Sequence, residues 1–416
     1  MDGGRERIQA LDRRVTAAAG RIRVLSSLRW PDDVEQRFLK GAHQGNPRAP
    51  GVRLGAVDLA EPRAALKAVR PELEGAHPAL RFLRETVDDS LAAADMLEGI
   101  GTERFSEIGL RLYGAPDDPV HPGAPTTLDA ARHFLHATDQ LQLPTPEPDL
   151  DAEAAAEWLR GQLAGIYPVD PPRVELTPGL ASLASAGSRR IRLRADARFR
   201  GLQLRQLLEH EALVHIATRR SGKAQPVLSA LGLSTPRTTS AQEGLATLAE
   251  LLSDTLDLSR LRRIALRVIG LQAALEGADF VELFRLFRDA GQDVEDSFHS
   301  SRRILRGGDA VRSGGVAMGV FPKDVVYVRG LLRVHGFLLA AARSGLGAAP
   351  RRLFCGRLTL ADAVRLGPLF DDGTIHPPLV VPRWVEDADC LAAQLVFSGL
   401  LTRVRLDGLE VEDFSR

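Results

Sequence analysis

The sequence predicts an α+β fold that is mostly helical, with a small sheet ahead of its central helices and a helical layer at the N-terminus. Two patterns support this prediction. Most of the chain has apolar residues three to four positions apart, which is the period of an amphipathic helix. The segment 189–194 instead alternates Arg with Ile191 and Leu193, which is the period of a strand with one solvated face.

The individual elements follow from the same patterns. Ile8, Leu11, Val15 and Ala19 form one apolar stripe and predict the first helix. We expect further helices at 31–39, 72–99, 127–141, 152–163, 202–219, 240–258, 260–290 and 322–344, and strands at 173–176 and 189–194. The acidic, proline-containing segment 143–153 lacks periodicity and is a predicted linker. It would separate a helical N-terminal region, residues 1–145, from a second domain, residues 146–416.

The bulk composition argues against several classes of protein. The 416 residues include 54 Lys and Arg and 54 Asp and Glu, so no net charge attracts the chain to nucleic acid or to an anionic membrane. The two cysteines are far apart, which argues against a disulfide scaffold. The N-terminus is charged, and no apolar run reaches the ~20 residues that span a bilayer. We therefore expect a cytoplasmic protein with no nucleic-acid or membrane partner, and the Arg, Ala and Gly content is typical of a GC-rich bacterial genome.

A metal-binding pattern lies in the segment LLEHEALVHIATRR at 207–220, where His210, Glu211 and His215 form H-E-x-x-x-H. Imidazole nitrogens are suitable ligands for Zn²⁺, and a carboxylate beside the first histidine can act as a general base toward water. Residues five apart on a regular helix lie about 140° from each other, so the two histidines could not bind one ion. We therefore predict a wider turn of the π type near 212–214. The pair His133 and His136 has no nearby carboxylate, and we interpret it as structural.

A catalytic zinc site needs a third protein ligand and an open position. The segment SAQEGLATLAELLSD at 240–254 is strongly helical, and with Ser240 as its N-cap it would place Glu243 in the first turn. Gly244 lacks a side chain where a second helix must approach closely. Glu250 lies two turns further along the same face and could accept a hydrogen bond from a ligand histidine. The predicted zinc site therefore consists of His210, His215 and Glu243, with Glu211 as the catalytic base.

Several ordered motifs resemble a known family: HEALVH, SGKAQP at 221–226, QEGLATLAE at 242–250, FPKDVVYVRG at 321–330 and, more weakly, LYGAP at 112–116. They are similar to the bacterial QEGLA-motif proteins and their relatives, the microtubule-associated tyrosine carboxypeptidases, which are zinc enzymes that remove the C-terminal tyrosine of α-tubulin. The resemblance covers roughly residues 150–345. It implies a zincin-like catalytic domain with the same three ligands and the same base. Leu213 and Val214 stand where the family often has small residues, and Ser221 stands where it commonly has Asn, which leaves the substrate open.

A carboxypeptidase must also hold the terminal carboxylate of its substrate, and arginine does this best through a two-pronged contact. The segment 301–315 offers four arginines next to glycine pairs: Arg302, Arg303, Arg306, which is the leading candidate, and Arg312. A solvated arginine-rich surface is the alternative interpretation. Lys323 begins the following helix, and Tyr327 one turn later could reach the metal and stabilise the developing oxyanion. Ordinary packing is an equally good explanation of Tyr327.

The expected activity is zinc-dependent hydrolysis of a peptide bond at or near the C-terminus of a peptide or protein, such as a biosynthetic precursor peptide. The strand at 189–194 would lie beside the cleft, where an extended peptide could pair with its edge. Two other functions compete with this one. One is a regulatory or binding protein that keeps the fold without turnover, and the other is a zinc hydrolase of a small amide. An open groove would favour peptides, and a closed pocket would favour small molecules.

Overall fold

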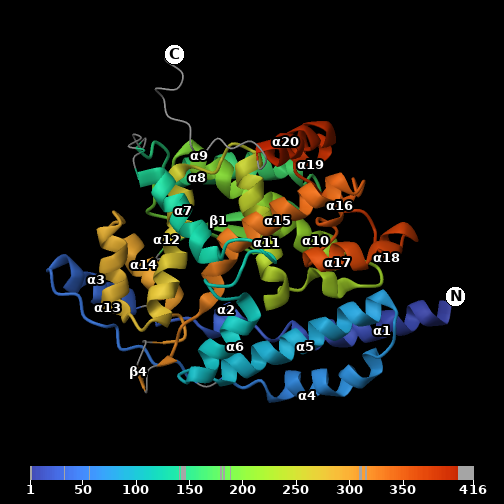
Figure 1. Ribbon diagram of the computed structural model, residues 1–416, viewed down its shortest axis with the longest axis horizontal. Coiled ribbons are helices and arrows are strands. Elements are labelled where there is room, and N and C mark those ends of the chain that lie inside the picture. The colour runs from blue at the N-terminus through green and yellow to red at the C-terminus, as the bar shows by residue number, and fades with distance from the viewer. Residues whose placement is uncertain are drawn as a thin grey trace, which may run out of the picture.

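The computed structural model confirms the predicted class, because helices make up 64% of the chain and one small three-stranded sheet accompanies them (Figure 1). The structure describes residues 2–31, 33–55, 57–139, 141, 147–178, 180, 183–187, 189–308, 312–313 and 316–401. The zincin-like character of the fold stays a prediction.

The N-terminal layer consists of helices, as predicted. They are α1 Asp2–Ala19, α2 Val24–Ser27, α3 Asp33–His43, α4 Ala60–Val69, η1 Arg70–Leu73, α5 Pro78–Glu98, α6 Glu103–Tyr113 and α7 Thr127–Asp139. Helices α1, α4 and α5 pack side by side (Figure 1). The apolar stripe of α1 faces this packing, since Leu11 and Val15 are buried.

The largest apolar cluster contains residues from both sides of the predicted domain boundary. Val15 and Leu83 belong to it together with Leu231, Phe287 and Val325. Residues 142–146, which include the start of the predicted linker, lie outside the described residues. The boundary between residues 145 and 146 stays a prediction.

The sheet comprises β1 Arg173–Thr177, β2 Ala184–Ala186 and β3 Arg190–Arg194 in the order β1-β3-β2, with β1 parallel and β2 antiparallel to β3. The alternation in β3 is confirmed, because Ile191 and Leu193 are fully buried in one cluster with helix α8, Ala152–Ile166. The expectation that the 189–194 strand offers a free edge to a peptide is wrong. It is the central strand, so its backbone groups already pair on both sides.

Helices make up most of the remaining described residues. Those that follow the sheet are α9 Gly201–Leu207, η2 Leu208–Ile216, α10 Ala217–Lys223, η3 Ser229–Gly232, α11 Pro236–Leu252, α12 Leu258–Leu275, α13 Phe280–Asp289 and α14 Val294–Ile304. A short ribbon, β4 Arg312–Ser313 and β5 Val316–Ala317, then leads to η4 Pro322–Asp324 and α15 Val325–Arg343. The last helices are α16 Ala349–Arg352, α17 Leu360–Arg365, α18 Gly367–Asp371, α19 Arg383–Glu386 and α20 Ala388–Leu401.

Several predicted helix boundaries need correction: the helix expected at 72–99 begins at Pro78, and the one expected at 240–258 ends at Leu252. Helix α11 begins at Pro236, not at Ser240, because proline at the first helical position lacks only an N–H that would be unpaired there. Glu243 therefore lies well inside the helix. The single helix expected at 260–290 is two helices, since Gly277 adopts a positive φ of 104° and Asp279 caps α13.

Helices α11 and α15 form the closest helix pair at the centre of the molecule (Figure 1). A Cβ on Gly244 would lie 2.2 Å from the carbonyl carbon of Gly330, so the expected close approach of a second helix at Gly244 is present. Residues 322–343 form one helix that is long and apolar enough to cross a membrane by length and composition alone. Half of its most apolar window is buried, and its packing against α11 explains its apolar character.

Candidate metal centre

The two histidines of the motif lie on a π-helix, η2, which spans Leu208–Ile216. This confirms the predicted wide turn. Hydrogen bonds from residue i to i+5 bring side chains five positions apart onto one face. The rings of His210 and His215 consequently face each other, with centroids 4.8 Å apart and planes at 90°.

The irregular turn has dedicated hydrogen-bond partners from outside it. The hydroxyl of Tyr167, at the end of α8, donates to the carbonyl oxygen of Ala212 at 2.7 Å. The hydroxyl of Thr218 donates to the carbonyl oxygen of Val214 at 2.8 Å. These two bonds give hydrogen-bond donors to backbone carbonyl groups within the widened turn. Nothing in the motif itself identifies Tyr167.

Glu243 completes a three-ligand group. Its Oε2 lies 3.5 Å from Nε2 of His210 and 3.4 Å from Nε2 of His215. The three ligand atoms lie within 4.8 Å of one another, and no other such group was found among the described residues. Oε2 of Glu243 is buried and has no hydrogen-bond partner among the described residues, so a cation bound between the three side chains would satisfy this oxygen.

The electrostatics of the group also favour a cation between the three side chains. Burial lowers the pKa of His210, but Glu243 and Glu250 outweigh it and raise that pKa to about 10. Burial raises the pKa of Glu243, while Lys323 and both histidines hold it well below its usual range. Two imidazoles and one carboxylate are also the ligand set of catalytic zinc sites that keep one position open. The residues present therefore fit a metal ion.

Glu250 contacts His210, as the helical spacing predicted. It is fully buried and accepts a hydrogen bond from Nδ1 of His210 at 2.6 Å, which leaves Nε2 facing the other two ligand atoms. Gln206 donates to Glu250 at 3.0 Å, and Arg260 donates to both of its oxygens at 3.2 and 3.1 Å. Burial raises the pKa of Glu250, but Arg260 and His210 lower it to about 2, so the group is a carboxylate.

Lys323, Arg303 and Tyr327 lie together beside the ligands, as the sequence placed them, yet both cations are already paired. Lys323 Nζ donates to Oε1 of Glu243 at 2.7 Å. Arg303 forms a two-pronged ion pair with Asp324, at 2.7 and 2.5 Å, and its Nη2 lies 3.4 Å from the Tyr327 hydroxyl. Lys323 Nζ also lies 5.1 Å from the centre of the Tyr327 ring. Lys323 thus contacts the metal group directly through Glu243, whereas Tyr327 and Arg303 are linked to it through Lys323.

The other predicted arginines are arranged differently. Arg306 donates from Nε to the carbonyl oxygen of Leu28 at 3.4 Å, and burial together with the charge of Arg303 lowers its pKa to about 10. Arg302 pairs with Glu35 at 3.4 Å. Arg312 belongs to β4, but its side chain lies outside the described part of the chain.

Sequence reasoning missed a stripe of arginines on α12. Arg260, Arg263 and Arg267 are spaced three and four apart on one face of a helix whose other positions are mostly apolar, and this spacing was the available signal. The Arg267 side chain is only 11% exposed, and its Nε lies 3.7 Å from Asp324. Burial and the nearby charge of Arg303 lower the pKa of Arg267 to about 9. The cations around Asp324 thus exceed its single negative charge.

A second missed arginine lies on the other side of the motif. Arg357 donates to the carbonyl oxygen of His215 at 3.4 Å and to the Ser234 hydroxyl at 2.6 Å. Burial and the charge of Arg219 lower its pKa to about 10, against the attraction of Glu243 and Glu211. Glu211 itself is half-buried, next to His210 in the π-helix. The predicted base thus follows His210 in the π-helix, and the guanidinium of Arg357 contacts the backbone of His215 in the same helix.

Comparison with known proteins agrees with this geometry. No curated protein matches the chain. The profile of the family described as microtubule-associated tyrosine carboxypeptidase matches residues 36–403. This span includes the metal group, the arginines of α12, Arg357 and most of the N-terminal helices. This family implies a peptidase activity of the carboxypeptidase type, acting on a peptide or protein. With nearly all of its length matched, the chain belongs to the microtubule-associated tyrosine carboxypeptidase family.

Proposed function

We propose that this protein is a zinc-dependent carboxypeptidase on a zincin-like fold, and that it hydrolyses a peptide bond at or near the C-terminus of a peptide or protein. The observation that carries the proposal is the buried group of His210, His215 and Glu243, with Glu211 in the same π-helix. A biosynthetic precursor peptide is the substrate we propose, with the cytoplasm as its location.

His210, His215 and Glu243 would hold the ion. When bound, Zn²⁺ would supply a Lewis acid that lowers the pKa of water and polarises the scissile carbonyl. Glu211 takes the proton from the attacking water. As the C–O bond forms and the C–N bond breaks, Glu211 returns the proton to the leaving amine. Tyr327, which lies near Arg303 and Lys323, would donate a hydrogen bond to the developing oxyanion.

We propose that the surplus positive charge around Asp324 holds the terminal carboxylate of the substrate. Arg303 donates two hydrogen bonds to Asp324, from Nε and Nη2. Nε of Arg267 lies 3.7 Å from the same carboxylate, and it is buried and has no hydrogen-bond partner among the described residues. A buried guanidinium is stabilised by a carboxylate that accepts two parallel hydrogen bonds. Arg267 is therefore a stronger candidate than Arg306, whose Nε donates to Leu28.

The test combines metal analysis with digestion of a peptide library, read by mass spectrometry. The wild type is expected to contain one zinc per chain and to release C-terminal residues. Glu211→Gln should keep the zinc and lose at least ~10²-fold in rate, because it cannot take the proton. Glu209→Gln is the matched control. It changes a half-buried carboxylate two residues away in the same π-helix, and it should retain activity.

Three results would contradict the proposal. Full zinc occupancy after Glu243→Ala would refute the ligand assignment. A zinc-loaded wild type that cleaves nothing in the library would favour a non-catalytic binding protein. Cleavage of small amides but not of peptides would favour a small-molecule hydrolase.

A further inference from the structure

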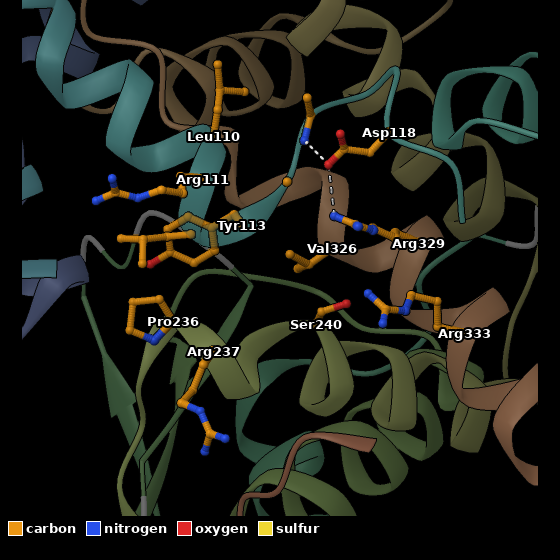
Figure 2. Close-up of a pocket in the computed structure, with 13 residues that line it drawn as sticks. Leu110, Arg111, Tyr113, Asp118, Pro236, Arg237, Ser240, Val326, Arg329 and Arg333 are labelled. Carbon is orange, nitrogen blue, oxygen red and sulfur yellow. Dashed lines mark hydrogen bonds and ion pairs between the residues drawn. The ribbon is translucent and has the colours of Figure 1, made fainter. Parts of the chain in front are cut away.

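A cavity of about 440 Å³ lies between α6, α11 and α15 (Figure 2). Its wall includes Asp118, Ser240, Arg329 and Arg333, and none of the three metal ligands lines it. The LYGAP segment, which the metal centre does not use, contributes Tyr113, Gly114 and Ala115 to the same wall. The cavity is thus a separate feature of the fold.

The charge of this cavity is strongly positive. Arg329 and Arg333 lie one turn apart on α15, and Figure 2 shows both guanidinium groups directed into the cavity. Asp118 is the only acidic residue in the wall, and it pairs with Nη1 of Arg329 at 3.2 Å. Arg111 adds a further positive charge to the wall. The wall therefore carries one carboxylate against these three guanidinium groups, of which Arg111 points away from Arg329 in Figure 2.

Arg237 is a fourth arginine of the wall, but its charge is already balanced. It pairs with Glu85 at 2.6 Å and with Asp362 at 2.9 Å, and in Figure 2 it points away from Arg329. Since Asp118 pairs with Arg329, the charges that no acidic residue of the wall balances are those of Arg333 on α15 and Arg111 on α6. The Arg329 side chain is only 18% exposed, and its Nε is buried without a hydrogen-bond partner among the described residues.

The loop beside Arg329 is shaped to hold it. Gly114 has a φ of +98°, and a Cβ at this position would lie 1.9 Å from Nη1 of Arg329. No residue other than glycine fits there without moving the guanidinium. The backbone N–H of Ala115 donates to Asp118 at 2.9 Å and orients the carboxylate that holds Arg329. The loop therefore holds the Arg329 guanidinium in a fixed position.

We propose that this cavity binds a small polyanion, a phosphate ester or an oligocarboxylate with at least two negative charges, between Arg329 and Arg333. Two adjacent guanidinium groups favour planar or tetrahedral oxyanions, because each presents parallel N–H donors. A volume of about 440 Å³ lies within the range of small-molecule sites. The hydroxyl of Ser240, directed toward Arg333 in Figure 2, supplies a further donor. A monovalent anion would leave part of the positive charge uncompensated.

The test is calorimetric titration of the full-length protein with pyrophosphate and with citrate at constant ionic strength. At least one of the two is expected to bind saturably with one site per chain. Binding of pyrophosphate alone would identify phosphate as the recognised group, and binding of citrate alone would identify carboxylates. Saturable binding of neither probe up to millimolar concentration would overturn the proposal.

Substitutions at Arg333 make the test specific. Arg333 is exposed at the cavity wall, so a change there leaves the core intact. Arg333→Gln should weaken binding about tenfold or more, and Arg333→Lys should weaken it less, because the charge remains. Arg285→Gln, at an exposed position on α13, is the matched control and should not change binding. Equal affinities for wild type and Arg333→Gln would refute the assignment, as would an equal loss in the control.

This experiment needs no zinc and no peptidase activity. Its outcome is therefore independent of the proposed function.

Discussion

Replacing Glu250 by Gln tests how the fold supports the metal ligands. Glu250 is fully buried, and it accepts hydrogen bonds from His210 and from Nε and Nη2 of Arg260. The amide keeps the shape of the side chain but removes its charge, which leaves Arg260 buried without a counter-ion. The lowering of the Glu250 pKa to about 2 corresponds to about 3 kcal/mol of net interaction with the charged form. We expect the variant to lose about that much stability at neutral pH.

The pH dependence of this loss has a definite sign. A carboxyl group whose pKa is lower in the folded state stabilises the fold above its unfolded-state pKa, about 4.3 for Glu. That contribution disappears as the pH falls toward the folded-state pKa, about 2 for Glu250. The difference between wild type and Glu250→Gln should therefore be complete at pH 6–7 and should shrink steadily below about pH 4.

Urea unfolding of the metal-free protein measures the free energy of unfolding, and competition for zinc with a chromophoric chelator measures the zinc affinity. Loss of the partner of His210 Nδ1 should lower zinc affinity about 10- to 100-fold. Glu157→Gln, at an exposed position on α8, is the control for a lost surface carboxylate. A destabilisation below about 1 kcal/mol together with an unchanged zinc affinity would refute this account of Glu250.

Three further perturbations probe other parts of the fold. Gly244→Ala should lower the free energy of unfolding by about 3 kcal/mol or more, since its Cβ would lie 2.2 Å from the backbone of α15. Gly336→Ala, whose Cβ would meet nothing within 4 Å, should raise it slightly, and urea unfolding measures both changes. With a colorimetric thiol reagent at pH 8, exposed Cys390 should react at once and Cys355 only on unfolding, because burial raises the Cys355 pKa to about 12. Tyr167→Phe should cost about 1–3 kcal/mol and also weaken zinc binding, and a variant that binds zinc normally would argue against a role for Tyr167 in the wide turn.

The sequence predicted the metal group well because its signals are local. The motif at 210–215 and the helix that contains Glu243 both depend on short-range spacing, and the misfit of a five-residue step led directly to the π-helix. Glu250 followed from helical periodicity in the same way. The predicted start of the helix that contains Glu243 is nevertheless four residues too late. Ser240 is a favourable N-cap residue, but proline is equally favourable at the first helical position, and the helix begins at Pro236.

The surroundings of the site could not be predicted in this way, because they depend on long-range packing. Arg357 approaches the backbone of His215 from 142 positions away, and no local pattern links the two. Arg306 was favoured because it precedes a glycine, yet its partner proved to be the carbonyl oxygen of Leu28, at a separation of 278 positions. Similarly, the edge strand of the sheet was misidentified because strand order is a property of the whole sheet, which no single strand encodes.

The wide turn also explains why a mostly helical protein keeps a small sheet. A turn with one residue more than the regular helix displaces backbone carbonyls, and each needs a partner in a buried setting. For Ala212 that partner is the hydroxyl of Tyr167, which stands between the end of α8 and the start of β1. Buried side chains of α8, β3 and η2 belong to one apolar cluster, which fixes the position of Tyr167 relative to the turn. The sheet layer thus holds the π-helix in its unusual geometry. If that helix binds zinc as proposed, a change that loosens β3 should lower zinc affinity before it affects the distant helices of the N-terminal layer.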